Sequence, residues 1–324
     1  MHSSPTFSFA GEAQFSSDAG LDWNSVQLRW FDHWLKGTNN GVEREAPVRI
    51  YVMGGGDAHK TPEGRIFVGG RWRDEQEWPL ARTTPIAFYL QRGGALSSGE
   101  LKDQVPPVTF TFDPRNPVPT FGGNISSFGA LISMGPMDQR CRATFWLCSD
   151  AKPLSSRNDI LVFQTPPLTD DLEVTGRLIV KLWAASDGPD TDFTAKLIDV
   201  YPPNADFPAG FDLNIGDSVV RARYRNGLSK AEFLKPGQPY ELTIEMYPTS
   251  LLFKRGHRIR LDISSSNFPR FDVNPNTGEP LNDNRRWRTA ENTVFMDAKH
   301  PSHVLLPIIP ASDSAERTGS NKPK

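Results

Sequence analysis

Residues 172–202 read LEVTGRLIVKLWAASDGPDTDFTAKLIDVYP, and this stretch decides the fold class. Two apolar runs rich in β-branched residues, Leu178–Trp183 and Phe193–Tyr201, flank a compact polar segment, Ser186–Asp192. The second run has a period of two, which is typical of a β-strand. Asp and Gly accept the backbone angles of a turn, and Pro189 fixes its own φ. The pattern therefore predicts a strand, a turn and a second strand, as a hairpin at the centre of a β-sandwich.

Similar strand-like segments recur along the chain from Val48 onward, separated by clusters of Pro, Gly, Asn and Asp. Regular short strands with such punctuation are typical of an antiparallel sandwich or jelly roll. Two long loops, Asp113–Gly135 and Asn267–Trp287, interrupt the series, and the polar segment Ala311–Lys324 is expected to be a disordered tail. The predicted fold class is all-β, a jelly-roll β-sandwich.

A helix is expected before the strands, over Asp22–Lys36. Its apolar residues recur at spacings of three and four, which places three tryptophans and a phenylalanine on one face. Asp22 is a suitable N-cap, and Gly37 is a suitable stop. Such a large aromatic face predicts that the helix is buried against a large partner surface.

Charge and hydropathy argue against several classes of partner. The 324 residues carry a formal net charge of −2, which gives no electrostatic reason to expect nucleic acid or an anionic membrane. No apolar run reaches the roughly 20 residues of a transmembrane helix. The first residues have no basic region and no continuous apolar core, so they do not form a signal peptide. For the chain as given a cytoplasmic location is favoured, and export stays open if a signal precedes it.

The two cysteines, Cys141 and Cys148, are seven residues apart in CRATFWLC. If this segment is one extended strand, the odd spacing places the two thiols on opposite faces, which argues against a disulfide. A structural zinc site would need two further ligands nearby. We therefore expect two ordinary reduced cysteines.

Motifs that carry chemistry are scarce in this sequence. It contains no Gly-x-Ser-x-Gly, phosphate loop, HExxH or CxxC motif. The segment Asp187–Asp192 holds three carboxylates that could bind a hard cation, but it lacks EF-hand spacing, so a structural turn is favoured. His300 and His303 could both touch a metal, although a solvated Pro loop is favoured. Asp32 and His33 are adjacent on the helix and so do not face each other. We predict no metal and no cofactor.

Three arginines, Arg221, Arg223 and Arg225, alternate in the segment RARYR. On a strand they would share one face, where we expect them to pair with carboxylates such as Asp199 or Asp262 in a structural network. The loop at residues 264–278 is expected to line a groove between domains.

Several longer strings resemble the CocE/NonD family of serine hydrolases, which comprises esterases, acylases and X-Pro dipeptidyl-peptidases. They include LRWFDHWLKGTNNGVEREAPVRIYVMGG at 28–55, GRWRDEQEWPL at 70–80, SDGPDTDFTAKLIDVYP at 186–202 and the string at 234–278 that begins LKPGQPYELTIEMYP. The resemblance covers nearly the whole chain to about Pro310. It implies an α/β-hydrolase domain with a Ser-Asp-His triad, a helical cap and a galactose-binding-like jelly roll, the X-Pro dipeptidyl-peptidase C-terminal domain.

This resemblance also implies a division of the present chain. Residues 1–46 would be the end of the hydrolase domain, 47–310 the jelly roll and 311–324 the tail. The family's catalytic histidine lies in a loop upstream of the last hydrolase helix, and His2 falls at that position as the candidate general base. The nucleophile and acid would precede residue 1, so the chain alone is expected to be inactive.

Two functions remain open. In the first, the chain belongs to a hydrolase that transfers acyl groups from small esters, amides or X-Pro peptides to water through an acyl-enzyme. Its partners would be a hydrolase domain in cis and, in some arrangements, further copies of itself. In the second, the jelly roll is an autonomous binding or assembly module, and Trp72, Trp78 and Trp287 form a platform for a sugar.

Overall fold

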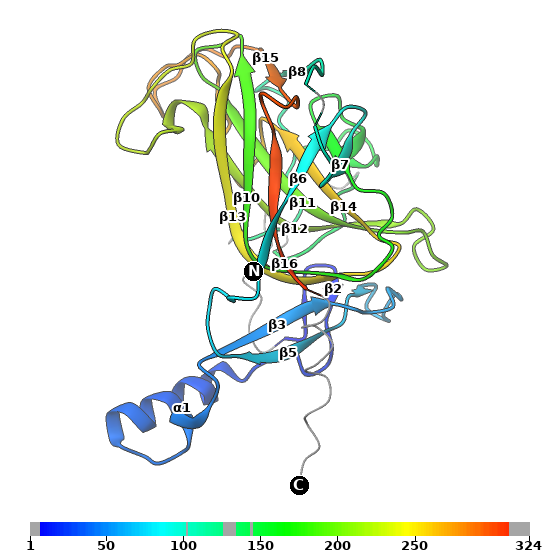
Figure 1. Ribbon diagram of the computed structural model, residues 1–324, viewed down its shortest axis with the longest axis vertical. Coiled ribbons are helices and arrows are strands. Elements are labelled where there is room, and N and C mark those ends of the chain that lie inside the picture. The colour runs from blue at the N-terminus through cyan, green and yellow to red at the C-terminus, as the bar shows by residue number, and fades with distance from the viewer. Residues whose placement is uncertain (1–6, 102, 126–133, 143–144, 311–324) are drawn as a thin grey trace.

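The computed structural model describes residues 7–101, 103–125, 134–142 and 145–310. Strands dominate these ranges, which confirms the predicted all-β class. Figure 1 shows a large curled β-body with a smaller part below it, where α1 (Trp23–Lys36) projects outward. His2 and the predicted tail, Ala311–Lys324, lie outside the described residues.

The strands of the described ranges follow one another in this order: β1 (Phe9–Ala10), β2 (Ala13–Gln14), β3 (Val48–Gly54), β4 (Ile66–Phe67), β5 (Gly70–Glu75), β6 (Thr84–Gln91), β7 (Ala95–Ser97), β8 (Val108–Phe112), β9 (Leu161–Gln164), β10 (Leu172–Ser186), β11 (Asp192–Tyr201), β12 (Phe211–Arg221), β13 (Tyr240–Phe253), β14 (Arg258–Ser264), β15 (Ala290–Val294) and β16 (His303–Ile309). Short 3₁₀ turns, η1 (Val42–Arg44), η2 (Leu154–Ser156) and η3 (Ala222–Tyr224), punctuate the loops.

Most of these strands form one 13-stranded sheet that folds over on itself. Its main path runs β12-β11-β14-β9-β7-β6-β16-β10-β13-β3-β5, and β15 links β10 to β8. The main core fills the space between the half around β10 and the half around β11, where Leu182, Phe193, Phe253 and Leu261 are fully buried. Burial of each such side chain contributes about 1.5–3 kcal/mol, so this interior holds the sandwich together.

The expected central hairpin is wrong, although both of its strands exist. β10 pairs with β13 and β16, whereas β11 pairs with β12 and β14. The segment between them is therefore an arch that crosses from one half of the sandwich to the other. Side chains of both strands enter the same core. Nearly every residue of β11 is buried, so this strand is covered on both of its faces. Sequence periodicity identifies a strand, but it does not indicate which strand becomes its neighbour.

A second, smaller core attaches the N-terminal segment to the jelly roll. Ala10 and Ala13 of this segment, with Ile66 of β4, pack against Phe211 and Leu213 of β12. β2 also pairs in parallel with β4. The segment at residues 7–21 is therefore held by the β-body.

The predicted helix is confirmed almost to the residue. α1 follows Asp22, whose carboxylate accepts hydrogen bonds from the Ser25 N–H (3.2 Å) and Oγ (2.5 Å). It ends at Gly37, which has a left-handed φ of 68°. None of its side chains is buried by the described residues, and Trp34 and Leu35 are 57% and 77% exposed. No helix in the described part of the chain is long and apolar enough to cross a membrane.

Candidate functional site

A groove of about 590 Å³ lies where the N-terminal segment meets the jelly roll. Its walls come from segments that are distant in the sequence: Phe7, Phe15 and Leu21, then β3 and β5, residues 214–217 of β12, residues 247–250 of β13, and Arg270. Two of the expected sugar-platform residues, Trp72 and Trp78, line it, and Trp287 lies outside it. Arg270 is the contribution of the loop at 264–278.

Aromatic rings form one wall of this groove. The Tyr51 ring lies edge-on to both Trp72 and Phe15, with centroid distances of 5.2 and 5.8 Å. Gly70 permits this packing, because a Cβ at that position would lie 2.5 Å from the Tyr51 ring. The wall therefore depends on a close approach that only glycine allows.

The polar atoms of these aromatic residues are already engaged by neighbours. The Tyr51 hydroxyl accepts a hydrogen bond from the Ser16 N–H (3.2 Å) and donates to the Gly69 carbonyl (3.3 Å). The Trp72 indole N–H donates to the Asp18 carbonyl (2.9 Å). Burial raises the pKa of Tyr51, so its hydroxyl stays protonated near neutral pH and is not a general base. These bonds fasten the N-terminal segment to β3 and β5.

The floor of the groove is polar but balanced in charge. The Arg270 guanidinium lies 2.5 Å from Asp217 Oδ1, and Asn267 donates to Asp217 Oδ2 at 2.6 Å. Outside the groove lining, the buried Lys196 ammonium donates to Gln139 Oε1 at 2.7 Å, and burial lowers the pKa of Lys196. The floor therefore offers the fixed Arg270–Asp217 ion pair to a ligand. Sequence motifs could not reveal this pair, because Asp217 and Arg270 come from separate segments of the chain.

The histidines considered in the sequence are engaged locally. His300 Nδ1 lies 3.1 Å from Asp297, and His303 Nδ1 lies 2.6 Å from the Pro301 carbonyl. A buried pair went unpredicted: His257 Nδ1 lies 2.9 Å from Asp199. Within the described ranges, no group of three or more His, Cys, Asp or Glu side chains is arranged to hold a metal ion. His2 lies outside these ranges, so its role stays a prediction.

Arginine side chains from other segments pair with the three carboxylates of the acidic turn, Asp187–Asp192. Asp187 pairs with Arg288 at 2.7 Å, and Asp190 pairs with the buried Arg223 at 2.7 Å. Asp192 holds Arg221 through two bonds of 2.9 Å. The carboxylates thus stabilise the arch between β10 and β11, in agreement with the structural interpretation.

The expected partners of the RARYR arginines were wrong. Arg223 lies in η3, past the end of β12, so the three side chains do not share a strand face. Their carboxylates are those of the acidic turn and, for Arg225, Glu232. Asp199 pairs with His257, while Asp262 pairs with Arg260. The prediction of a structural network holds with different members.

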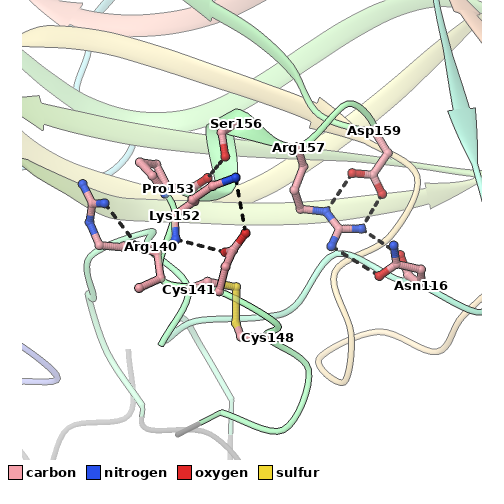
Figure 2. The surroundings of a disulfide bond; sticks show 11 residues. Asn116, Arg140, Cys141, Cys148, Lys152, Pro153, Ser156, Arg157 and Asp159 are labelled. Atoms are coloured by element: carbon pink, nitrogen blue, oxygen red, sulfur yellow. Dashed lines mark hydrogen bonds and ion pairs between the residues drawn. A yellow bond between two sulfur atoms is a disulfide. The ribbon is translucent and has the colours of Figure 1, made fainter. Parts of the chain in front are cut away.

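The expectation of reduced cysteines is also wrong. Cys141 and Cys148 form a disulfide, with their Cα atoms 5.6 Å apart (Figure 2). The segment is not an extended strand: the Phe145 N–H bonds to the Arg142 carbonyl and the Cys148 N–H to the Phe145 carbonyl, both at 2.9 Å. These turns reverse the chain, so the alternation of faces along a strand does not apply.

A carboxylate cluster joins the N-terminal segment to the jelly roll beside this loop. The Asp138 N–H donates to Glu12 Oε2 at 2.8 Å, and Asp138 Oδ1 accepts from the Asp212 N–H at 3.1 Å. Burial, together with the charges of Asp212 and Glu12, raises the pKa of Asp138 to about 6. Its protonation therefore changes within a physiological range.

Comparison with known proteins identifies the class of this β-body. Residues 40–305 match the X-Pro dipeptidyl-peptidase C-terminal non-catalytic domain. The chain is 36% identical over 295 residues to cocaine esterase from Rhodococcus sp., an alignment that covers 88% of this chain and 46% of that protein. The chain belongs to the CocE/NonD family of hydrolases and corresponds to the C-terminal portion of its members.

Solved structures agree with this assignment. An aminopeptidase from a marine sediment Thaumarchaeota archaeon superposes with a TM-score of 0.70 at 26% identity, over 92% of this chain and 46% of that one. An α-amino acid ester hydrolase gives a TM-score of 0.69 at 26% identity, over 93% and 48%. The chain spans a little under half the length of these relatives.

Proposed function

We propose that this chain is the C-terminal part of a serine hydrolase that transfers acyl groups from small esters, amides or X-Pro peptides to water through an acyl-enzyme. The observation that carries this proposal is the groove, because its wall begins with Phe7, shortly after His2. His2 would act as general base, and the serine nucleophile and acid would lie outside the chain. Residues 1–46 would then complete the hydrolase domain, 47–310 would form the jelly roll, and 311–324 the tail.

In this arrangement the groove is one wall of a cleft that a hydrolase domain in cis completes. A histidine activates a serine only when the Oγ lies within hydrogen-bond reach. The oxyanion that develops during acyl transfer also needs fixed donors, which the hydrolase domain would supply. We assign both requirements to the hydrolase domain, so the part of the jelly roll is to position the N-terminal segment and to shape the cleft.

The exposed face of α1 supports the same partner. Trp23, Trp30, Phe31 and Trp34 are each about half exposed. Contiguous apolar patches of this kind mark interaction surfaces. We propose that the hydrolase domain covers this face of α1. The alternative is that a second copy of the chain covers it.

Hydrolysis of a p-nitrophenyl ester tests the proposal. We expect no turnover by the chain alone and turnover by a longer protein that includes the upstream hydrolase domain. In the longer protein His2→Ala should lower kcat/KM by at least about a thousandfold. His59→Ala, an exposed histidine of the jelly roll, should leave the rate unchanged. Turnover by the chain alone that disappears with His2→Ala would overturn the proposal.

The second candidate is an autonomous binding module. It is favoured by Trp72 and Trp78, which present aromatic surface to the groove. The Trp72 indole N–H is already bonded inside the protein, however, and stacking alone would have to hold a sugar. Saturable binding on a glycan array by the chain alone, lost in Trp78→Ala, would favour this function over the first.

A further inference from the structure

The disulfide lies within a loop whose two ends, at residues 139–141 and 152–154, run side by side. The Leu154 N–H donates to the Gln139 carbonyl and the Cys141 N–H to the Lys152 carbonyl, both at 2.9 Å. Figure 2 shows the two sulfur atoms beside this base, with Lys152 and Pro153 close to Cys141. Cys141 is buried and Cys148 is half-buried, so Cys148 is the more exposed half of the disulfide.

Aromatic side chains of this loop pack on two segments that lead into the groove. The Phe145 ring lies 4.9 Å from Phe121, and the Trp146 ring lies 6.0 Å from Phe268. Phe121 is followed within two residues by Gly123, which lines the groove. Phe268 is likewise followed by Arg270, on the groove floor. The loop thus covers the back of the groove wall.

Hydrogen bonds fasten these two segments to each other and to the base of the loop. The Phe268 N–H donates to the Val118 carbonyl at 2.9 Å, and the Thr120 N–H donates to the Phe268 carbonyl at 2.8 Å. Gln139, two residues before Cys141, donates from Nε2 to the Phe121 carbonyl at 3.0 Å. A movement of the loop would therefore reach both segments.

We propose that the Cys141–Cys148 disulfide is a redox latch on the groove wall. Reduction by a dithiol breaks the S–S bond by a two-electron transfer; the two sulfurs take up two protons, and the dithiol is oxidised to its own disulfide. The freed loop then withdraws Phe145 and Trp146 from Phe121 and Phe268. The segments at 118–123 and 266–271, which carry Gly123 and Arg270, lose this support.

Hydrogen exchange on the chain itself measures this coupling. In the chain-entropy account, a crosslink that closes a loop of this length disfavours the open loop by roughly fiftyfold. Reduction with dithiothreitol should therefore speed exchange of residues 141–142 and 145–148 by about that factor, and exchange of 118–123 and 266–271 by at least about fivefold. Amides of β10 and β13, in the main core, should be unchanged. Re-oxidation should reverse the effect.

Two variants sharpen the test. Cys141→Ser combined with Cys148→Ser should behave as the reduced chain under all conditions; reversible reduction of the unmodified chain serves if this variant does not fold. Phe145→Ala, with the disulfide intact, should loosen 118–123 already in the oxidised chain, while exchange of the disulfide loop itself should still respond to reduction. Unchanged exchange at 118–123 and 266–271 on reduction would overturn the proposal, as would two free thiols in the unreduced chain.

The effect on catalysis rests on the proposed function, whereas the effect on the groove wall does not. In the longer protein, reduction should lower kcat/KM for the ester. If reduction speeds hydrogen exchange of the groove wall but does not change ester hydrolysis, the latch is supported. The proposal that the groove takes part in hydrolysis is then contradicted. If neither responds, the latch itself is wrong.

Discussion

The Asp138→Asn substitution should stabilise the protein near neutral pH and have no effect in acid. Asp138 lies where Glu12 of the N-terminal segment meets Asp212 of β12, and its side chain is only 21% exposed. Burial is the largest cause that raises its pKa, and the two neighbouring carboxylates add to it. Arg140, at 3.9 Å, opposes the shift only in part. The ionised side chain is therefore destabilising in the folded state.

The magnitude follows from the displaced pKa. A rise from 3.8 to about 6 is about two units, and each unit corresponds to about 1.36 kcal/mol. Because the folded state holds the proton more tightly, this penalty is absent below pH 4 and grows as the pH rises to about 6. It then stays constant at up to about 3 kcal/mol. Asparagine is neutral and keeps the Oδ1 acceptor for the Asp212 N–H, so it removes the penalty.

Urea unfolding followed by circular dichroism between pH 4 and 8 measures the difference between the two proteins. We expect Asp138→Asn to be more stable by about 1–3 kcal/mol at pH 7.5 and equal at pH 4. Asp283→Asn, at an exposed loop carboxylate, is the control and should give no pH-dependent difference. A stabilisation that does not vary with pH, or a loss of stability at pH 7.5, would refute the reasoning.

Three further variants test other parts of the structure. Arg223→Met leaves a buried carboxylate of the acidic turn without its cation and should lower the free energy of unfolding by about 3–5 kcal/mol in urea; a loss below about 1 kcal/mol would contradict this. His257→Leu leaves the buried Asp199 with Tyr201 as its remaining side-chain partner and should cost about 1–3 kcal/mol at pH 7.5, and an unchanged urea midpoint would be the contrary result. Trp30→Ser combined with Trp34→Ser should reduce binding of a hydrophobic dye by the chain alone and shift its mass toward the monomer in light scattering. Unchanged dye binding and unchanged mass would show that the face of α1 plays no part in association.

Local features of this fold could be predicted from the sequence, and pairings could not. α1 was located to within a residue because its signals, the Asp22 cap and the Gly37 stop, are properties of neighbouring residues. β10 and β11 were also located as strands. The strands that pair with β11 could not be predicted. β11 pairs with β12 and β14, not with β10, and this pairing depends on core contacts between residues that are distant in the sequence.

The same distinction explains the misjudged side chains. The spacing of Cys141 and Cys148 argues against a disulfide only if the segment between them is a straight strand. The segment turns back on itself instead, so its two thiols meet. Arg223 was assigned to the wrong carboxylates because β12 ends before it and a 3₁₀ turn redirects its side chain to Asp190. The composition of the groove could be predicted only in part, from Trp72, Trp78 and the loop at 264–278, since its other walls come from segments that are distant in the sequence. Only the long strings shared with a family carried that information.

The N-terminal segment is held firmly by the β-body, and in the proposed enzyme this would give the jelly roll a part in positioning the base. This segment follows the candidate base, and it is fastened to the β-body by a small buried core and by Ser16, whose Oγ donates to the Gly70 carbonyl at 2.7 Å. Glu12 adds a link to Asp138, and Tyr51 adds another to Ser16. In the proposed enzyme a displacement of the base by about 1 Å would cost on the order of a hundredfold in rate. The jelly roll would therefore affect catalysis through the position of His2, without contributing a reacting group.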